Sequence, residues 1–247
     1  MRRSPLLFCT LVILSACLPS ATLSPPASSS QASTPALSSD TSLSSSAAST
    51  STKELPASIP PLPVPFSPQA PTANWDALHE ESCEEMAMLM VVHYLNGTPL
   101  NPEIAEREIQ DLVAWEHDHG YGDDVNAEKM VEIAQKKLGV RARVRTDVTI
   151  ETIKEELASG NPVVIPAAGR KLGNPYFSGD GPWYHALTII GYKPGWTGDY
   201  FVTNDPGTRR GQQYTYRADV LLDAIHDWTG VKEEIGNGRK AMVILER

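Results

Sequence analysis

Cysteine is scarce in this chain, and several common kinds of site are missing. Only three cysteines occur among 247 residues, at Cys9, Cys17 and Cys83. No Cys-x-x-Cys or His-Glu-x-x-His pattern is present, which argues against a zinc centre of familiar spacing. The chain also lacks a glycine-rich phosphate loop and a dinucleotide-binding fingerprint. The sequence therefore predicts chemistry with no metal and no organic cofactor.

Positive charge is in short supply as well. The formal net charge is −9. Few charged residues precede position 63, namely Arg2, Arg3, Asp40, Lys53 and Glu54. An acidic domain repels nucleic acid and anionic surfaces. We therefore expect no nucleic-acid partner, whereas cationic peptides and cell-surface polymers are compatible with this charge.

The N-terminal residues have the features of an export signal. Met1-Arg2-Arg3 precede an apolar stretch, residues 6–14, that is too short to be a permanent membrane helix. The stretch leads into Leu14-Ser15-Ala16-Cys17, which resembles the lipobox of bacterial lipoproteins, where the cysteine carries lipid and becomes the mature N-terminus. We expect residues 1–17 to be a signal peptide with a lipobox. The protein would then be exported and anchored to the membrane at the cell surface through Cys17, or otherwise secreted.

Residues 18–62 contain no aromatic side chain and consist mainly of Ser, Thr, Ala and Pro. Such a segment buries too little apolar surface to offset its ordering entropy. We expect a disordered tether. Residues 63–247 hold all five tryptophans and all eight tyrosines, and they are enough for one domain with a hydrophobic core.

Helical patterns come first in that domain and strand patterns come last. The expected helices are 83–96, 102–116, 127–138, 150–158 and 219–228, and the expected strands are 140–145, 161–166, 184–192, 200–204 and 241–245. An N-terminal helical half followed by an antiparallel sheet half is an α+β arrangement. A cleft between the halves is a natural site.

Cys83 lies at the predicted start of a helix. Ser82 and Glu85 have the spacing of a capping box, so Cys83 falls on the first turn. Free N–H groups and the helix dipole favour a thiolate there. Nearby carboxylates oppose this effect and raise the thiol pKa, and they belong to Glu80, Glu81, Glu84 and Glu85. The alternative is a buried core cysteine without a chemical role.

A hairpin would bring His185 close to Asp205. If strands 184–192 and 200–204 pair around a turn near Trp196, facing residue numbers sum to about 392, which puts His185 within one or two residues of Asp205. A carboxylate there orients the imidazole and stabilises its protonated form. Asn204 points to the other face of its strand. It is the rival partner because a register shift of one residue would bring it to His185 instead of Asp205.

Five ordered blocks of this sequence resemble the bacteriocin-processing (double-glycine leader) peptidase-like domains, which are papain-like cysteine peptidases. They are Val64-Pro65-Phe66-Ser67-Pro68-Gln69, Ser82-Cys83-Glu84-Glu85, residues 160–166, residues 184–192 and Asn204-Asp205-Pro206. The resemblance covers nearly all of residues 63–247 and implies a papain-like fold. It also implies that Cys83 is the nucleophile, His185 the general base and then acid, and Asp205 the orienting residue. The Gln69 amide would contribute to the oxyanion hole.

The chain departs from the family pattern after the nucleophile. Family members commonly have glycine and a small residue there, whereas this chain has Glu84 and Glu85. The leading hypothesis is an exported cysteine peptidase that hydrolyses peptide bonds of a peptide or protein substrate through a thioester. One alternative is a non-catalytic peptide- or glycan-binding module on the same scaffold. Another is a cell-wall peptide amidase or transpeptidase.

Two further clusters suggest structure rather than chemistry. The His117-Asp118-His119 segment lies in an acidic loop, which is more typical of a solvated surface than of a metal site. Met86, Met88 and Met90 alternate along an expected helix, so their sulfur atoms do not share one face, and core packing is expected instead of a copper site.

Overall fold

A computed structural model describes residues 54–247. The expected signal, the expected lipidation site Cys17 and most of the expected tether lie outside the described residues. The α-helices are α1 (Ala77–Glu80), α2 (Cys83–Asn96), α3 (Pro102–Asp118), α4 (Ala127–Lys136), α5 (Ile150–Ala158) and α6 (Ala218–Ala224). The strands are β1 (Arg141–Arg145), β2 (Val163–Ala168), β3 (Tyr184–Lys193), β4 (Tyr200–Asn204), β5 (Tyr214–Arg217) and β6 (Met242–Glu246), with 3₁₀ helices η1 (Gly169–Leu172) and η2 (Lys232–Asn237). The predicted α+β class is confirmed.

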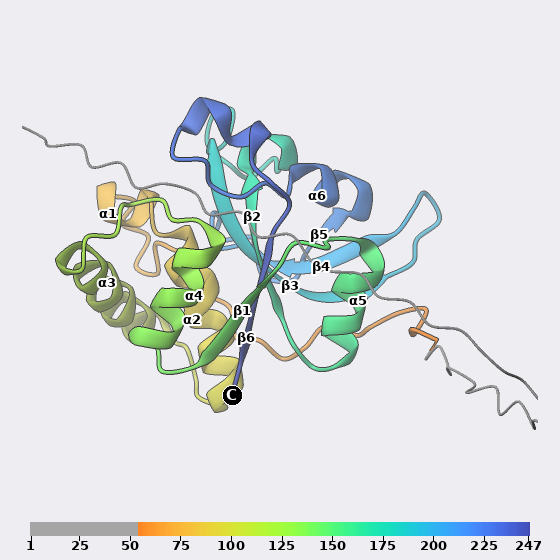
Figure 1. Ribbon diagram of the computed structural model, residues 1–247, viewed down its shortest axis with the longest axis horizontal. Coiled ribbons are helices and arrows are strands. Elements are labelled where there is room, and N and C mark those ends of the chain that lie inside the picture. The colour runs from red at the N-terminus through yellow and green to blue at the C-terminus, as the bar shows by residue number, and fades with distance from the viewer. Residues whose placement is uncertain (1–53) are drawn as a thin grey trace, which may run out of the picture. The chain divides into compact units, whose positions relative to one another are not determined.

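The strands form one antiparallel sheet in the order β1-β6-β2-β3-β4-β5. Helices cover both of its faces. Figure 1 shows α2, α3 and α4 on one side of the strands and α5 on the other. No helix among residues 54–247 is long and apolar enough to cross a membrane.

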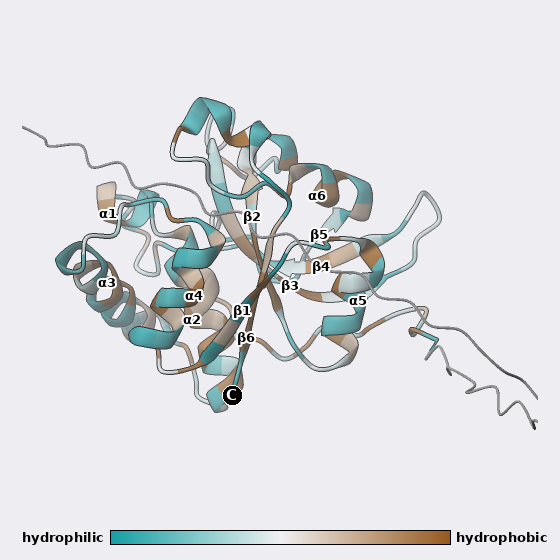
Figure 2. Ribbon diagram, viewed as in Figure 1, coloured by the Kyte–Doolittle hydropathy of each residue, from teal (hydrophilic) through white to brown (hydrophobic). Residues whose placement is uncertain are grey.

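Alternation along the central strands creates two hydrophobic cores. Val164 of β2 and Val243 of β6 pack with α2 and α4, whereas their neighbours Val163 and Ile244 pack with α5 and α6. Successive side chains of a strand point to opposite faces, so a sheet covered on both faces is apolar at nearly every position. Figure 2 accordingly shows brown, apolar residues along the buried strands and on α2, with polar residues toward the outside of α3.

Helix α2 runs through the interior of the helical half. Nearly all of its side chains are buried, including Met86, Met88 and Met90, which confirms the expected core role. A helix that is apolar around its circumference is a buried helix. It ends at Gly97, whose φ of 64° is the left-handed conformation that glycine adopts at little cost.

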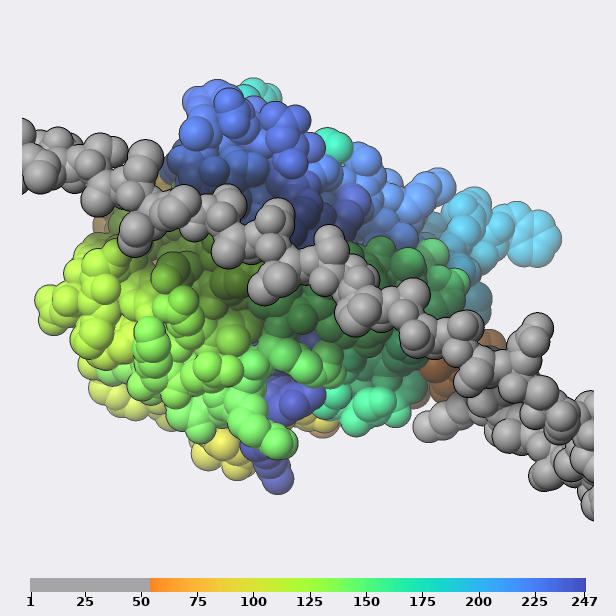
Figure 3. Space-filling model, in the orientation of Figure 1, coloured from red at the N-terminus to blue at the C-terminus, as the bar shows by residue number. Residues whose placement is uncertain are grey.

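The hairpin of β3 and β4 has the predicted pairing. Lys193 faces Tyr200 beside the turn, and after a bulge at position 190 Thr188 faces Asn204. Figure 3 shows the tip of this hairpin, in light blue, standing out from the body of the domain. Thr188 faces Asn204, which is the last residue of β4. If the same pairing is continued for three more residues, His185 lies beside the chain that follows β4.

Three expectations need correction. The last helix ends at Ala224 and not at 228, because Ile225 pairs with Ala167 and the His226 N–H donates to Pro166. Neither the short helix α1, which follows Trp75, nor the strand β5 is among the expected elements. Both rest on tertiary contacts: the Gln69 side chain bonds to the end of α1, and β5 completes the edge of the sheet beside β4.

The folded unit also begins before position 63. Ile59 exchanges two backbone hydrogen bonds with Tyr192, and the Leu62 N–H donates to Ile190 at the bulge. Ile59 is buried among apolar residues on the α5 side of the sheet. The expected boundary therefore falls inside the structured region, because backbone pairing, which composition does not reveal, fixes these residues.

Replacing Ile59 by Ala is expected to lower the free energy of unfolding by about 2 kcal/mol, since burying such a side chain is favourable and its loss leaves a gap. Ser58→Ala, at an exposed neighbouring position, should change it by less than about 0.5 kcal/mol. Chemical denaturation of the full chain measures both. Equal stability of the two variants would show that this segment is not part of the folded unit.

Candidate active site

Three of the predicted site residues line one cleft. It has a volume of about 340 Å³, and its walls include Gln69, Cys83 and His185. Cys83 begins α2 and His185 lies near the start of β3, so the two halves of the domain supply opposite walls. Asp205, which follows β4, lies behind the imidazole and is completely buried.

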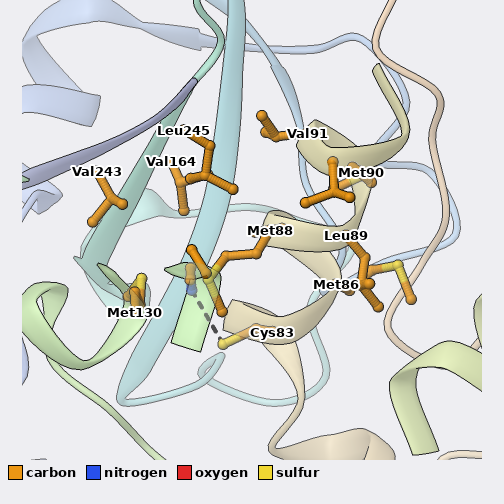
Figure 4. Close-up of a cluster of buried hydrophobic side chains, with 14 of the residues drawn as sticks. Cys83, Met86, Met88, Leu89, Met90, Val91, Met130, Val164, Val243 and Leu245 are labelled. Atoms are coloured by element: carbon orange, nitrogen blue, oxygen red, sulfur yellow. Dashed lines mark hydrogen bonds between the residues drawn. The ribbon is translucent and has the colours of Figure 1, made fainter. Parts of the chain in front are cut away.

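Cys83 is held at the start of α2 by the sheet. The Ala186 N–H donates to Cys83 Sγ at 3.2 Å, and Figure 4 shows this contact as a dashed line from the labelled Cys83. Ala186 is the residue after His185, so this bond brings the sulfur to the strand position next to the imidazole. Cys83 is also the only cysteine in the described part of the chain, and it is a free thiol.

The expected capping box does not form. The Ser82 hydroxyl donates backward to the Leu78 carbonyl of α1, 2.5 Å away, and caps no N–H of α2. Glu85 is buried and does not reach back to the helix start. The expectation was wrong because α1 ends directly before α2 and offers the hydroxyl a nearer partner.

The sequence predicts two opposing effects on Cys83, a helix start that favours a thiolate and nearby carboxylates that disfavour it. Burial raises the pKa of Cys83 well above its usual value, and the charge and hydrogen bond of Glu84 raise it further. Glu85 and Asp124 add smaller effects in the same direction. Cys83 Sγ donates to Glu84 Oε2 at 3.0 Å, a contact that the neutral thiol makes. Burial and the neighbouring carboxylates therefore both oppose a thiolate at this helix start.

The predicted pairing of His185 with Asp205 is present. His185 Nε2 lies 2.7 Å from Asp205 Oδ1, and both side chains are almost fully buried. Asn204 points elsewhere: its amide donates to the Val64 carbonyl at 3.1 Å and its oxygen accepts from the Gln213 N–H. Asn204 therefore holds the backbone at Val64 and Gln213 and does not contact the imidazole.

Asp205 receives hydrogen bonds from every side. Besides His185, the Gly207 N–H donates to Oδ1 at 3.0 Å, while the Tyr216 hydroxyl and the Asn174 amide donate to Oδ2 at 2.5 and 3.1 Å. Burial alone would raise the pKa of Asp205, but the charge and hydrogen bond of His185, together with these donors, hold it below the usual value. The carboxylate is thus fixed in position and stays ionised.

Sequence reasoning missed Tyr216 and Asn174. The alternation Tyr214-Thr215-Tyr216 is a strand signal that would have placed one tyrosine inward. Asn174 lies in a loop and carries no such signal. Gly207 has a steric role as well, because a Cβ there would lie 2.8 Å from His185 Cε1.

Gln69 reaches the cleft, but its amide hydrogens are already used. Gln69 Nε2 donates to the carbonyls of His79 and Glu80 at 2.8 and 3.0 Å. These bonds hold the end of α1 against the cleft wall. A contribution of Gln69 to an oxyanion hole requires the release of one of them, and that role stays a prediction.

Glu85 and Glu116 form a buried carboxyl pair between α2 and α3. Burial raises the pKa of Glu85 to about 7 and that of Glu116 further, and the charge of Glu85 adds to the rise for Glu116. Glu85 Oε2 and Glu116 Oε1 are buried and have no hydrogen-bond partner among the described residues. Because like charges in one buried site do not both ionise, we expect the pair to share one proton.

The remaining candidates from the sequence do not converge on a site. His117 lies 3.1 Å from Asp123 at the surface, and His119 stacks on Trp115. Within residues 54–247, no group of three or more His, Cys, Asp or Glu side chains is arranged to hold a metal ion.

The carboxyl pair predicts a stability that falls with rising pH. In the unfolded chain Glu85 and Glu116 ionise near 4.5, whereas in the folded domain their pKa values are raised. Their contribution is therefore complete below pH 4.5 and is lost as the pH rises through about 7. Glu116→Gln keeps a donor for Glu85 without an ionisable proton, so it should reduce the loss of unfolding free energy between pH 5 and pH 8 by at least about 1 kcal/mol.

Denaturation curves at the two pH values measure this difference. Glu103→Gln, on the exposed side of the same helix, serves as the matched control and should leave the pH dependence unchanged. An identical pH dependence in the wild type and the Glu116 variant would show that the pair does not hold a shared proton.

Comparison with known proteins identifies a family. A model of the Peptidase_C39 like family matches residues 61–234. A search of curated proteins finds no match. A structure described as a C39-like peptidase from Bacillus anthracis is 16% identical over 77% of this chain and 98% of its own, with a TM-score of 0.49.

Two other solved structures are similar at a lower level. Digestive procathepsin L 3 from Tenebrio molitor larval midgut is 12% identical over 80% of this chain and 72% of its own, with a TM-score of 0.40. Xylellain, a cysteine protease from Xylella fastidiosa, is 16% identical over 78% of this chain and 87% of its own, with a TM-score of 0.30. The family model covers more than half of the chain, so the predicted family resemblance is confirmed and the chain belongs to the Peptidase_C39-like family.

Proposed function

We propose that this protein is an exported cysteine peptidase that hydrolyses peptide bonds through Cys83, His185 and Asp205. The observation that carries the proposal is the 2.7 Å contact between His185 Nε2 and Asp205 Oδ1 at the wall of the cleft that Cys83 also lines. Because Nε2 is engaged by Asp205, Nδ1 is the ring nitrogen that remains for the thiol proton. A thiol and an oriented imidazole that line one cleft are the groups that nucleophilic catalysis uses.

The reaction proceeds in two stages. The Cys83 proton passes to His185 while the sulfur attacks the substrate carbonyl, and the oxyanion that forms is stabilised by the Cys83 backbone N–H at the start of α2. Collapse breaks the C–N bond, and His185 returns the proton to the leaving amine. His185 then deprotonates water, which hydrolyses the thioester and releases the acid and the free thiol.

The cleft around these groups suits a peptide. Apolar and aromatic side chains, Phe177 and Trp183 among them, line it together with the carboxylates of Glu80, Glu81 and Asp124. Lys232 is the counter-ion of Glu81 at 3.1 Å. This balance of charge favours a peptide or protein substrate without a high negative charge.

Asp205→Ala should lower kcat on a cleaved peptide by about two orders of magnitude or more while the domain stays folded, because the imidazole loses the group that orients it and stabilises its charge. Asn204→Ala is the matched variant. Since Asn204 contacts backbone groups and not His185, its effect should be mainly on stability. Hydrolysis rates of folded variants, with Cys83→Ala as the inactive reference, measure the order.

A larger loss of kcat in the folded Asn204 variant would contradict the role of Asp205. Peptide hydrolysis by Cys83→Ala would overturn the proposed function altogether and favour a binding module on this scaffold.

We also propose that Cys17 carries lipid and that residues beyond it tether the domain to the membrane. The support is the order of Leu14-Ser15-Ala16-Cys17 behind an apolar stretch, followed by a long Ser/Thr/Ala/Pro segment. A single chain gives only weak anchoring, so more than one acyl chain is needed.

Mass spectrometry of the mature N-terminus from a bacterial host should find Cys17 as the first residue with diacylglycerol on its sulfur. Cys17→Ser should abolish both the lipid mass and membrane fractionation. A mature chain that begins beyond Cys17 without lipid would rule out the anchor and leave simple secretion.

A further inference from the structure

The thiol of Cys83 is bonded to its neighbour in the chain. Cys83 Sγ donates to Glu84 Oε2 at 3.0 Å and accepts from the Ala186 N–H at 3.2 Å. Glu84 is completely buried, and its Oε1 accepts from the Val125 N–H at 3.0 Å. Both carboxyl oxygens are therefore engaged, one by the backbone and one by the nucleophile.

This contact is not a routine consequence of sequence. Adjacent residues on a helix do not face each other, so a side chain at position 84 ordinarily points away from position 83. The backbone of the loop before α4 supplies the Val125 N–H that holds the Glu84 carboxyl in the interior. That loop is fixed in turn by the Tyr184 hydroxyl, which donates to the Val125 carbonyl at 2.8 Å.

The surroundings of Glu84 are acidic. Burial raises the pKa of Glu84 well above its usual value, and the charge of Glu85 raises it further. The titratable and charged groups that face this pair from α2, α3, the loop before α4, β3 and η2 are Glu85, Glu116, Asp124, Tyr184, His185 and Lys232. Lys232 lies 3.8 Å from Asp124, and the imidazole of His185 lies 2.7 Å from the Asp205 carboxylate.

We propose that Glu84 is a further catalytic residue, one that accepts the Cys83 thiol hydrogen and keeps the nucleophile neutral until Glu84 itself is protonated. The proposal rests on the peptidase function proposed above and adds the regulation of its nucleophile by proton uptake. It makes Glu84 the residue that sets the pH range of reactivity.

The proton balance explains the effect. With Glu84 ionised, transfer of the thiol proton to His185 would leave a thiolate and a carboxylate side by side in a buried site, which Coulomb repulsion opposes strongly. With Glu84 protonated, the same transfer leaves one thiolate and one imidazolium, and the Glu84 O–H can donate to the sulfur. One proton from solvent is taken up on Glu84, and no other group is consumed.

Glu84→Gln tests this directly. Glutamine has nearly the same shape, its oxygen can keep the Val125 bond, and it carries no charge at any pH. We expect the rate constant for alkylation of Cys83 by iodoacetamide, followed by peptide-resolved mass spectrometry, to rise by about tenfold or more at pH 8, corresponding to at least one unit of thiol pKa. The ratio to wild type should shrink as the pH falls, because protonated Glu84 then resembles the amide.

Glu85→Gln is the matched control. It removes a buried carboxyl from the same helical turn that does not bond to the sulfur, so its effect on alkylation should be clearly smaller. An equal acceleration in both variants, or a slower rate in Glu84→Gln, would overturn the proposal. Denaturation curves establish that the variants are folded.

A second measurement does not depend on any variant. In the pH range where Glu84 is ionised, ultraviolet absorbance of the Cys83 thiolate in the wild-type protein should appear only well above the usual thiol range near 8.5. A midpoint at or below that value with Glu84 ionised would refute the restraint by Glu84. Peptide hydrolysis separates the two proposals: accelerated alkylation of Glu84→Gln, with no cleavage by it or by the wild type, would contradict the peptidase function alone.

Discussion

The packing of α2 against β3 is the contact on which the rest of the site depends. Two donors of one face of β3 fix the helix: the Ala186 N–H bonds to Cys83 Sγ, and the Thr188 hydroxyl bonds to the Ala87 carbonyl at 3.2 Å. Together they set the position of the helix along the strand. A helix shifted by one turn would move by about 5.4 Å and would carry the sulfur away from the imidazole. The cleft therefore follows from the register between one buried helix and one strand.

That packing is maintained despite a high density of buried acid. A buried carboxylate is costly unless donors or a proton compensate its charge. Here Glu84 has the Val125 N–H and the thiol, whereas the raised pKa values of Glu85 and Glu116 favour a proton on that pair. Replacing buried charged groups by apolar ones of similar volume is often neutral or stabilising, so packing stability alone does not account for these acids. Local conflict with good packing is a common mark of a functional site.

Much of this arrangement was predictable because it depends on local rules. Side-chain caps at Asn101 and Asn126, the left-handed Gly97 and the hairpin pairing all follow from short-range chemistry. The hairpin pairing also predicts that His185 and Asp205 lie close together. The pairing of two strands around a turn relates positions 20 residues apart without any knowledge of the core.

What could not be predicted depends on contacts between distant segments. The Ser82 hydroxyl donates to the Leu78 carbonyl and not to its own helix, and the Glu84 carboxyl lies in the interior, where it accepts a hydrogen bond from the Val125 N–H. A sequence gives the count of carboxylates around Cys83 but not which one touches the sulfur. In the same way, the support of Asp205 by Asn174 comes from a loop without any periodic signal.

Two buried carboxyl groups in one site behave in opposite ways, and the difference lies in their donors. Asp205 has four donors, one of them an imidazole that gains charge, and its pKa is lowered despite complete burial. Glu84 has one backbone N–H and a weak thiol donor among other acids, and its pKa is raised. The environment thus keeps negative charge beside His185 and favours a proton beside Cys83. This separation of pKa values gives two carboxyl groups different roles. Asp205 holds His185 in place, and in our proposal Glu84 controls when Cys83 can ionise.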